Sequence, residues 1–354
     1  MRVWIDLSNS PHPLLFAPIS RRLQGEGHEV LVTARDNAQT VELAYERWPE
    51  AQVIGGESPA SWGTKAATIG RRMRNLRSWA RARRLDVALS HNSYAQIAAA
   101  RSLGIPAVTA MDFEHQPANH LAFRLASTIL LPEALSPAAV RRQGAAQLKV
   151  VRYPGLKEEL YIGDFEPDSE ILARLGIERH PRTIVIVARS PPSRATYHHF
   201  ENSLFGEALR VVCSRADTVC VVLARHREQV AALERLELPG CTVPAGAIDS
   251  RSLIYASDLM LGAGGTMTRE AALMGIPTWT LFAGRPPSVD LWLEERGLLA
   301  RLERVEQLNL APRSAQPRSI ASLAARGAAV EQVFVEAVSA VAARLPSASA
   351  DMKR

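Results

Sequence analysis

The stretch of sequence that decides the fold is SDLMLGAGGTMTREAALMGIPTWTLF, residues 257–282. An apolar strand at its start runs into a turn that contains three glycines, Gly262, Gly264 and Gly265. A helix is predicted from Thr266 to Met274, because Gly275 and a nearby proline are typical of a helix end. A second apolar strand completes the unit. This order of strand, turn, helix and strand is typical of a parallel sheet with helices on its faces.

The same alternation recurs along the rest of the chain. Strands at 3–7 and 28–33 enclose a helix at 14–25, and a second series begins with the apolar run 183–188. The 354 residues exceed what one hydrophobic core of about 250–300 residues holds, so two domains are expected. We predict a GT-B-like α/β architecture in which two doubly wound, Rossmann-like domains face a central cleft. The predicted N-terminal domain is 1–155, the C-terminal domain is 156–345 with its last helix returning to the first domain, and 346–354 is a flexible tail.

Composition narrows the class of protein. Hydrophobic residues make up 47% of the chain and charged residues 22%, which is typical of a globular protein. The three cysteines, Cys213, Cys220 and Cys241, include no CxxC pair and predict neither a disulfide framework nor a zinc knuckle. The first residues form a strand rather than a signal peptide, and no run of about 18 apolar residues occurs. We therefore expect a cytoplasmic protein without a cofactor.

One segment accounts for much of the net charge of +6. Residues 65–84 predict an amphipathic helix with a packed back and a cationic front. Its arginines are Arg71, Arg72, Arg74, Arg77, Arg81, Arg83 and Arg84. A solvated helix face is one interpretation. The other is attraction to a phosphorylated acceptor or to anionic headgroups, with peripheral contact at the inner face of the membrane. Nucleic-acid binding is not predicted, because no RNP-like aromatic run or recognition-helix pattern accompanies the charge.

The glycine turn also predicts a chemistry. Open α/β sheets bind ligands at the carboxyl ends of their strands, and glycines there let a phosphate approach free backbone N–H groups at a helix N-terminus. Glu270, one helical turn further on, is an acceptor suited to the paired hydroxyls of a ribose. GAGGTM does not fit GxGxxG or a P-loop, which disfavours NAD binding and NTP hydrolysis. The alternative is that the glycines only form a tight turn.

The segment AGGTMTREAALMGIP resembles the nucleotide-binding segment of the GT-B superfamily. It is similar there to the lipid-linked N-acetylglucosaminyltransferases of peptidoglycan synthesis and to the non-hydrolysing UDP-N-acetylglucosamine 2-epimerases. The resemblance implies that Gly264 and Gly265 lie by the phosphates and that Glu270 binds the ribose of a UDP-sugar. Thr266, the first residue of the predicted helix, is a further candidate for nucleotide-sugar binding. The whole chain, from VWIDLSNSPH through YPGLKEELYIGDF, resembles an uncharacterised archaeal and bacterial family of GT-B-like fold and unknown function.

Further candidates for nucleotide-sugar binding follow other strands of the second domain. Arg189, Ser190 and Arg194 lie after its first strand, and Arg285 and Asp290 follow its last strand. Arginine presents paired donors to phosphate, so these side chains could neutralise a departing diphosphate. Because no DxD triplet is present, we expect a metal-independent reaction. Salt bridges within the loops are the alternative for each of them.

The first domain contributes candidate catalytic residues. His12, between two prolines in the loop after the opening strand, is a candidate base for an acceptor hydroxyl. Asp112, Glu114 and His115 gather ionisable groups after the strand at 107–110. An ion pair between Glu114 and Arg124 is the structural alternative.

The predicted function is a GT-B glycosyltransferase that uses a nucleotide sugar, UDP-linked, in polysaccharide or glycoconjugate synthesis, with an unidentified acceptor. A non-hydrolysing UDP-sugar 2-epimerase is the first alternative. The sequence departs from those epimerases at two points, where His-Gly-Asp-Thr is replaced by His91-Asn92-Ser93-Tyr94 and where a later His-Arg-Glu-Asn element is blurred into residues 193–202. A nucleotide-sugar-binding protein without catalytic activity is the second alternative.

Overall fold

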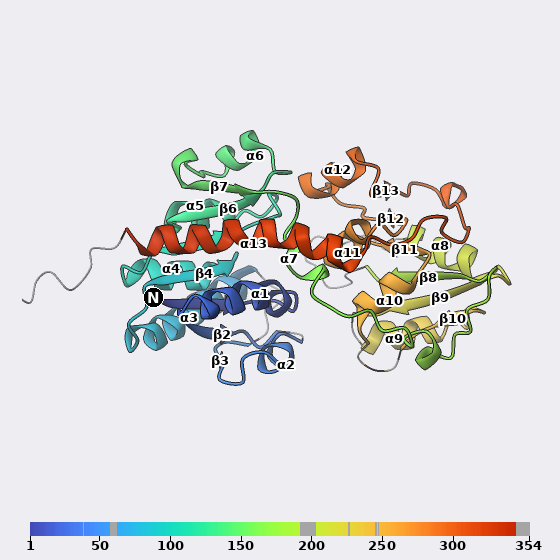
Figure 1. Ribbon diagram of the computed structural model, residues 1–354, viewed down its shortest axis with the longest axis horizontal. Coiled ribbons are helices and arrows are strands. Elements are labelled where there is room, and N and C mark those ends of the chain that lie inside the picture. The colour runs from blue at the N-terminus through green and yellow to red at the C-terminus, as the bar shows by residue number, and fades with distance from the viewer. Residues whose placement is uncertain are drawn as a thin grey trace, which may run out of the picture. The chain divides into compact units, whose positions relative to one another are not determined.

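The computed structural model describes residues 1–37, 39–56, 62–191, 203–225, 227–244, 246 and 248–344, with only the backbone at 62–66 and 227. The chain divides into two compact units (Figure 1). The first consists of Met1–Tyr161, Pro287–Val289 and Arg326–Arg354, and the second of Ile162–Pro286 and Asp290–Ala325. The predicted tail at 346–354 and the candidate Arg194 lie outside the described residues, as does the blurred element at 193–202.

The first unit is built on a seven-stranded sheet in the order β3-β2-β1-β4-β5-β6-β7, and every strand pair in it is parallel. Its strands are β1 (Arg2–Leu7), β2 (Glu29–Ala34), β3 (Gln52–Val53), β4 (Val87–His91), β5 (Ala107–Ala110), β6 (Thr128–Pro132) and β7 (Val150–Tyr153). Its helices are α1 (His12–Gly25), α2 (Thr40–Tyr45), α3 (Trp62–Arg81), α4 (Tyr94–Ser102), α5 (Asn119–Leu125) and α6 (Pro137–Arg142), with a 3-10 turn at Gln147–Lys149. The short α7 (Glu159–Ile162) ends this series.

The second unit is built on a six-stranded parallel sheet in the order β10-β9-β8-β11-β12-β13. Its strands are β8 (Ile184–Arg189), β9 (Thr218–Leu223), β10 (Cys241–Thr242), β11 (Leu259–Gly262), β12 (Thr278–Thr280) and β13 (Ala300–Arg301). Its helices are α8 (Ser203–Cys213), α9 (Arg227–Glu234), α10 (Ser250–Ala256), α11 (Thr266–Met274) and α12 (Ser288–Glu295), with 3-10 turns at Ala173–Leu175 and Val305–Gln307. The prediction of two parallel-sheet α/β units is confirmed.

Both sheets reverse their strand order at one point, between β1 and β4 in the first unit and between β8 and β11 in the second. At such a topological switch point the loops that leave the two central strands diverge to opposite faces of the sheet, which leaves room for a ligand at their carboxyl ends. The central strands are buried there, as in β8, whose apolar residues from Ile184 to Ala188 are at most 1% exposed. Each unit therefore has its own place where a site is expected.

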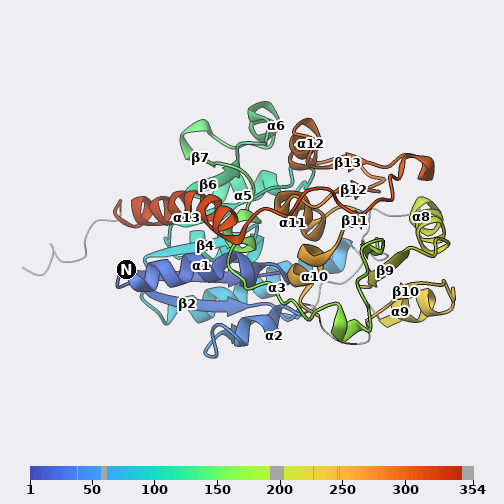
Figure 2. The same cartoon turned by 45° about the vertical axis from the view of Figure 1, so that its right-hand side comes forward.

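The last helix, α13 (Ile320–Ala342), is shared between the units in sequence. Its later part, from Arg326 onward, runs along the sheet of the first unit (Figure 2). Phe334 is fully buried there, and its ring centroid lies 5.2 Å from that of Tyr153 at the end of β7. Burial of such aromatic rings attaches this part of the helix to the first unit.

Candidate functional site

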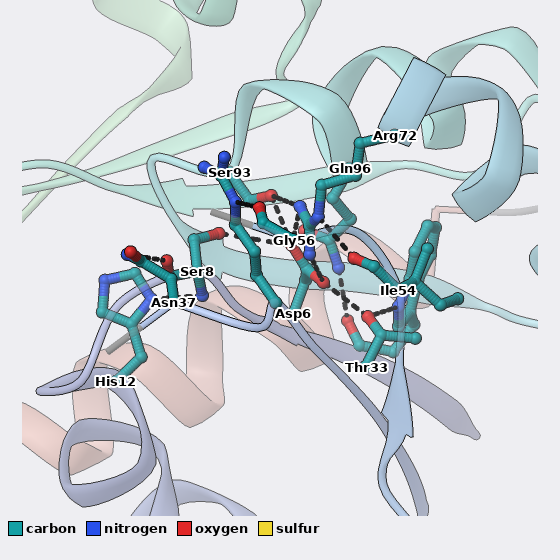
Figure 3. Close-up of polar contacts among 12 residues, drawn as sticks. Asp6, Ser8, His12, Thr33, Asn37, Ile54, Gly56, Arg72, Ser93 and Gln96 are labelled. Atoms are coloured by element: carbon teal, nitrogen blue, oxygen red, sulfur yellow. Dashed lines mark hydrogen bonds and ion pairs between the residues drawn. The ribbon is translucent and has the colours of Figure 1, made fainter. Parts of the chain in front are cut away.

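At the switch point of the first unit, the Asp6 carboxylate is fully buried and bound to Arg72 from α3 (Figure 3). The guanidinium meets both carboxylate oxygens, with Nη2 2.8 Å from Oδ1 and Nη1 2.9 Å from Oδ2. The Thr33 hydroxyl donates to Oδ1, and the Ser93 hydroxyl donates to Oδ2. A buried charge is tolerated only when it is paired and hydrogen-bonded in this way.

Arg72 therefore corrects the prediction that all the arginines of residues 65–84 lie on the cationic front of the helix. Its side chain is 5% exposed, and its Nε donates to the Ile54 carbonyl at 2.8 Å. The backbone at Gly55 has a φ of +89°, and a Cβ there would lie 2.9 Å from Cδ of Arg72. Glycine at this position is what lets the guanidinium stem pass.

His12 is the first residue of α1 rather than a loop residue, and it is 3% exposed. Its Nδ1 accepts a hydrogen bond of 3.0 Å from the backbone N–H of Ser8. Burial, with the nearby His91 and Lys157, holds the pKa of His12 well below its usual value of 6.5. A neutral ring whose Nδ1 accepts carries its proton on Nε2, so it donates from that atom and cannot take up a proton there. This geometry favours hydrogen-bond donation from Nε2, and a catalytic role for His12 stays a prediction.

A cluster of buried ionisable groups lies beside His12 in the first unit. The His91 ring stacks edge-on against it with centroids 5.3 Å apart, and His91 Nε2 lies 3.3 Å from Oδ1 of Asp112. The other Asp112 oxygen accepts from Lys157 Nζ, which also binds Glu158. All four of these residues are at most 9% exposed. The arrangement connects an imidazole, a carboxylate and an ammonium group in one buried cluster, which we call the His91 cluster.

Sequence reasoning singled out Asp112 but missed His91, Lys157 and Glu158 as its partners. The signal was present in the segment YPGLKEELYIGDF, which holds one of only four lysines in the chain. Its position beside Asp112 depends on the course of the chain after β7, which no local pattern specifies.

Glu114 does not form the ion pair with Arg124 that the sequence offered as the alternative, and its catalytic role stays a prediction. Its Oε1 accepts from the backbone N–H of Ser288 at 2.8 Å and from the Ser288 hydroxyl at 2.5 Å, and these residues belong to the same unit. Arg124 instead donates to the carbonyls of His120 and Gln143. The second carboxylate oxygen of Glu114 is buried without a hydrogen bond. Glu114 thus holds Ser288 in place and keeps one acceptor unused.

In the second unit, the glycine turn lies at the corresponding switch point. Gly264 and Gly265 have φ values of +82° and +96°, which side chains disfavour. Gly265 is the N-cap of α11 and has no capping side chain, and none of the residues from Gly265 to Met267 donates its N–H to an acceptor among the described residues. Gly262 must also be a glycine, because a Cβ at this position would collide with the Thr268 hydroxyl. The turn therefore presents bare amides at the positive end of a helix dipole.

Arg189 ends β8 in register with Gly262 of β11, so the two residues lie side by side at the carboxyl ends of these central strands. Its guanidinium donates to the carbonyls of Leu223 and Ala224. Burial and the neighbouring Arg225 lower the pKa of Arg189 to about 10, against the opposing effect of Glu270, and leave it cationic at neutral pH. The Ser190 hydroxyl next to it is buried without a hydrogen bond. Cationic and polar groups thus border the glycine turn.

The remaining candidates differ in what they can do. Glu270 is 4% exposed and carries a charge that acts on Arg189. Asp290 is bound to Arg269 in a buried ion pair at 2.8 Å, the salt bridge that the sequence offered as the alternative, and its role in ligand binding stays a prediction. Arg285 is exposed and has no partner among the described residues, and Thr266 begins α11 half-buried. Among the described residues, no group of three His, Cys, Asp or Glu side chains is arranged to hold a metal ion.

Comparison with known proteins places these observations in a family. Residues 1–321 match the model of a protein family of unknown function, DUF354, and the chain belongs to that family. An uncharacterized protein of Methanocaldococcus jannaschii, MJ0665, is 28% identical over 312 residues, which cover 86% of this chain and 89% of that protein.

Solved structures show the same fold at low sequence identity. The UDP-N-acetylglucosamine 2-epimerase of Rickettsia bellii is similar with a TM-score of 0.71 and 14% identity over 97% of each chain. The UDP-GlcNAc 2-epimerase of Methanocaldococcus jannaschii is similar with a TM-score of 0.67 and 13% identity, covering 95% of this chain and all of that one. The glycotransferase of kitacinnamycin is similar with a TM-score of 0.61 and 16% identity over 98% of this chain and 99% of that one. The GT-B-like fold is therefore confirmed.

We predict that Arg72→Met destabilises the first unit by about 3–5 kcal/mol, because it leaves the Asp6 carboxylate buried without its cation. Asp6→Leu combined with Arg72→Met should recover much of this loss, because both charges are then absent. Urea unfolding measures each difference. Arg74→Met, an exposed arginine of the same helix, is the matched control and should change stability by no more than about 0.5 kcal/mol. A loss for Arg72→Met as small as that of the control would contradict the stabilising role of the pair.

A second prediction concerns pH. The pKa of His12 is lowered in the folded protein. As the pH falls below about 6.5, His12 is therefore protonated in the unfolded chain but stays neutral in the folded one. The free energy of unfolding therefore declines with acidification in that range. Above it, His12 is neutral in both states and its protonation no longer changes the free energy of unfolding. His12→Asn retains an acceptor for the Ser8 N–H and should remove this part of the pH dependence.

The measurement is the unfolding free energy of both proteins between mildly acidic and neutral pH. His180→Asn is the control, because the His180 side chain is 71% exposed and should leave the pH dependence unchanged. Parallel curves for wild type and His12→Asn would show that His12 is not held neutral.

Proposed function

We propose that this protein is a GT-B-type enzyme that binds a nucleotide sugar, UDP-linked, and transfers the glycosyl group to an acceptor hydroxyl. The observation that carries the proposal is the uncapped N-terminus of α11, where the positive-φ glycines 264 and 265 present free amides beside the cationic Arg189. A diphosphate is the anion that suits this set, because several N–H donors and a guanidinium can share its charge.

The other polar groups of the turn fit the rest of a nucleotide sugar. The Ser190 and Thr268 hydroxyls are buried without hydrogen bonds, so a ligand oxygen near them would satisfy groups that are otherwise costly to bury. The exposed Arg285 is free to meet a phosphate or sugar hydroxyl. Glu270 is assigned to the ribose hydroxyls, as the resemblance to the GT-B superfamily implies.

The first unit supplies the acid–base chemistry in this proposal. As the acceptor oxygen forms its bond to the anomeric carbon, the bond from that carbon to the diphosphate oxygen breaks and its electron pair leaves with UDP. The hydroxyl proton passes to the His91 cluster, where Asp112 and His91 lie 3.3 Å apart. His12 donates a hydrogen bond from Nε2 and takes no proton, since burial keeps its ring neutral. Stabilisation of the leaving diphosphate then rests on the α11 amides and Arg189.

A UDP-sugar 2-epimerase is the second candidate, and the His91 cluster is the observation that favours it. Elimination and re-addition of UDP needs acids and bases around one sugar ring, and the cluster brings an imidazole, a carboxylate and a lysine together. Two of the similar solved structures are named as UDP-GlcNAc 2-epimerases, which makes this reaction worth testing directly.

We predict that UDP raises the melting temperature of the wild type and raises that of Glu270→Ala far less. At 100 times its Kd a ligand stabilises a protein by about 2.7 kcal/mol, or roughly 5–10 °C for a unit of this size. A hundredfold weaker variant would gain only about 1 °C at the same concentration. Thermal-shift measurement with UDP and with other nucleoside diphosphates tests this. Arg235→Ala, an exposed arginine of the same unit, is the control and should respond as the wild type does. Equal shifts for wild type and Glu270→Ala would refute the ribose assignment.

The two candidate reactions separate in a sample that contains a UDP-sugar and no acceptor. Under the transferase proposal, NMR shows an unchanged sugar, and UDP is released only after an acceptor is added. Asp112→Asn should lower turnover by roughly 100-fold or more while UDP still binds, because it removes a group that takes part in proton transfer. Appearance of the C2 epimer without acceptor would instead establish the epimerase.

A further inference from the structure

Three helices, α3, α4 and α5, cover one face of the first sheet and share one hydrophobic core. Leu76 and Ala80 of α3, Ala99 of α4 and Phe123 of α5 all belong to this core and are at most 1% exposed. The outer surface of these helices, which we call the α3–α5 face, is therefore the solvent side of a single packed layer.

The α3–α5 face is cationic without any compensating acid. The sequences of the three helices contain no Asp or Glu. Exposed arginines from this layer and from the residues just after α3 are Arg71, Arg74, Arg81, Arg84 and Arg101. The spacing of three, three and four residues from Arg71 through Arg74 and Arg77 to Arg81 places these side chains on one side of α3.

These arginines are distinct from their neighbours on the same helix. Arg72 is bound to Asp6, and Arg83 donates to the Trp79 carbonyl with its guanidinium 4.4 Å from the Trp79 ring. In contrast, none of Arg71, Arg74 and Arg81 has a hydrogen bond or ion pair with another described residue. A row of like charges without partners costs self-repulsion, which an anionic partner would relieve.

A large apolar side chain is exposed on the same layer of helices. Leu121 of α5 is 57% exposed. Two aromatic side chains of these helices are less exposed than Leu121. Trp79 is half-buried beneath Arg83, and Phe123 is fully buried. A single-stranded nucleic acid would use exposed rings for base stacking, whereas an anionic bilayer combines phosphate charge with an apolar interior for aliphatic side chains.

We propose that the α3–α5 face docks on an anionic lipid surface. Arg71, Arg74 and Arg81 contact headgroup phosphates, and Leu121 reaches into the boundary between headgroups and acyl chains. No helix in the described part of the chain is long and apolar enough to cross a membrane, so this attachment would be peripheral. The proposal does not depend on the proposed enzymatic function.

The test is co-sedimentation of the full-length protein with vesicles. Phosphatidylcholine vesicles with added phosphatidylglycerol should bind the wild type, and vesicles of phosphatidylcholine alone should bind it far less. Each Lys or Arg near an anionic surface strengthens partitioning by about fivefold, so Arg71→Ala, Arg74→Ala and Arg81→Ala together should weaken it by roughly 100-fold. Leu121→Gln should weaken it by roughly threefold or more, because it removes an aliphatic contact.

Two matched variants keep the test specific. Arg182→Ala, Arg210→Ala and Arg235→Ala together remove the same charge from exposed positions of the second unit and should leave vesicle binding unchanged. Arg71→Lys, Arg74→Lys and Arg81→Lys together preserve the charge and should retain most of the binding. Melting temperatures confirm that each variant is folded.

Equal losses in the α3 and control triple variants would overturn the proposal, as would binding that does not depend on phosphatidylglycerol. Displacement of the wild type from vesicles by an equal mass of single-stranded RNA would also overturn it, in favour of a nucleic-acid partner.

Discussion

The ion pair between Asp6 and Arg72 is the interaction on which the organisation of the first unit depends. It draws together β1 through Asp6, β2 through Thr33, the β4–α4 turn through Ser93 and helix α3 through Arg72. Because a carboxylate of 0% exposure cannot be left without its cation, any displacement of α3 from the sheet would carry the cost of an unpaired buried charge. The pair therefore fixes where α3 lies, and with it the residues of the loop that follows β1, including Ser8, whose N–H orients the ring of His12.

The two units use the same strand order but fill their switch points in different ways. In the first unit an internal ion pair with its hydroxyl donors occupies the carboxyl ends of the central strands, so the charged groups there satisfy one another. In the second unit the corresponding place holds glycines, bare helix amides and the cationic Arg189, for which the described residues supply no carboxylate partner as close as Asp6 is to Arg72. A positive potential that the protein itself does not neutralise is what binds an anion. The asymmetry explains why the phosphate-binding proposal falls on the second unit and the acid–base chemistry on the first.

Much of the fold followed from local patterns. The alternation of apolar strands with helices predicted both sheets, and the helix from Thr266 to Met274 has the bounds that its glycines and Pro277 indicate. The site was predicted only in part, for a physical reason. Glycines and strand-end residues can be recognised from their positions in the sequence. The contact between Lys157 and Asp112 cannot, because these residues are 45 positions apart and meet only through the course of the folded chain. Arg72 illustrates the same limit. Seven other arginines and lysines lie in the same segment, and no local pattern shows that Arg72 is the one that pairs with the buried Asp6 carboxylate. The tautomer of His12 depends on a backbone N–H four residues away, which sequence spacing does not reveal.

A shared fold leaves the reaction to be argued from the groups that remain available at the site. The epimerase resemblance would place an acid in the segment that here reads His91-Asn92-Ser93-Tyr94, but the Ser93 hydroxyl is already committed to Asp6. Glu114 has one oxygen committed to Ser288, and His12 is a donor. The groups of the first unit that remain for proton transfer are then His91 with Asp112 and Lys157, and the second carboxylate oxygen of Glu114. One connected cluster suffices to take a proton from a single attacking hydroxyl, whereas epimerisation also needs a group that returns a proton to the opposite face of the sugar. The small number of ionisable groups that remain in the first unit is therefore the strongest reason to favour glycosyl transfer over epimerisation as the proposed reaction.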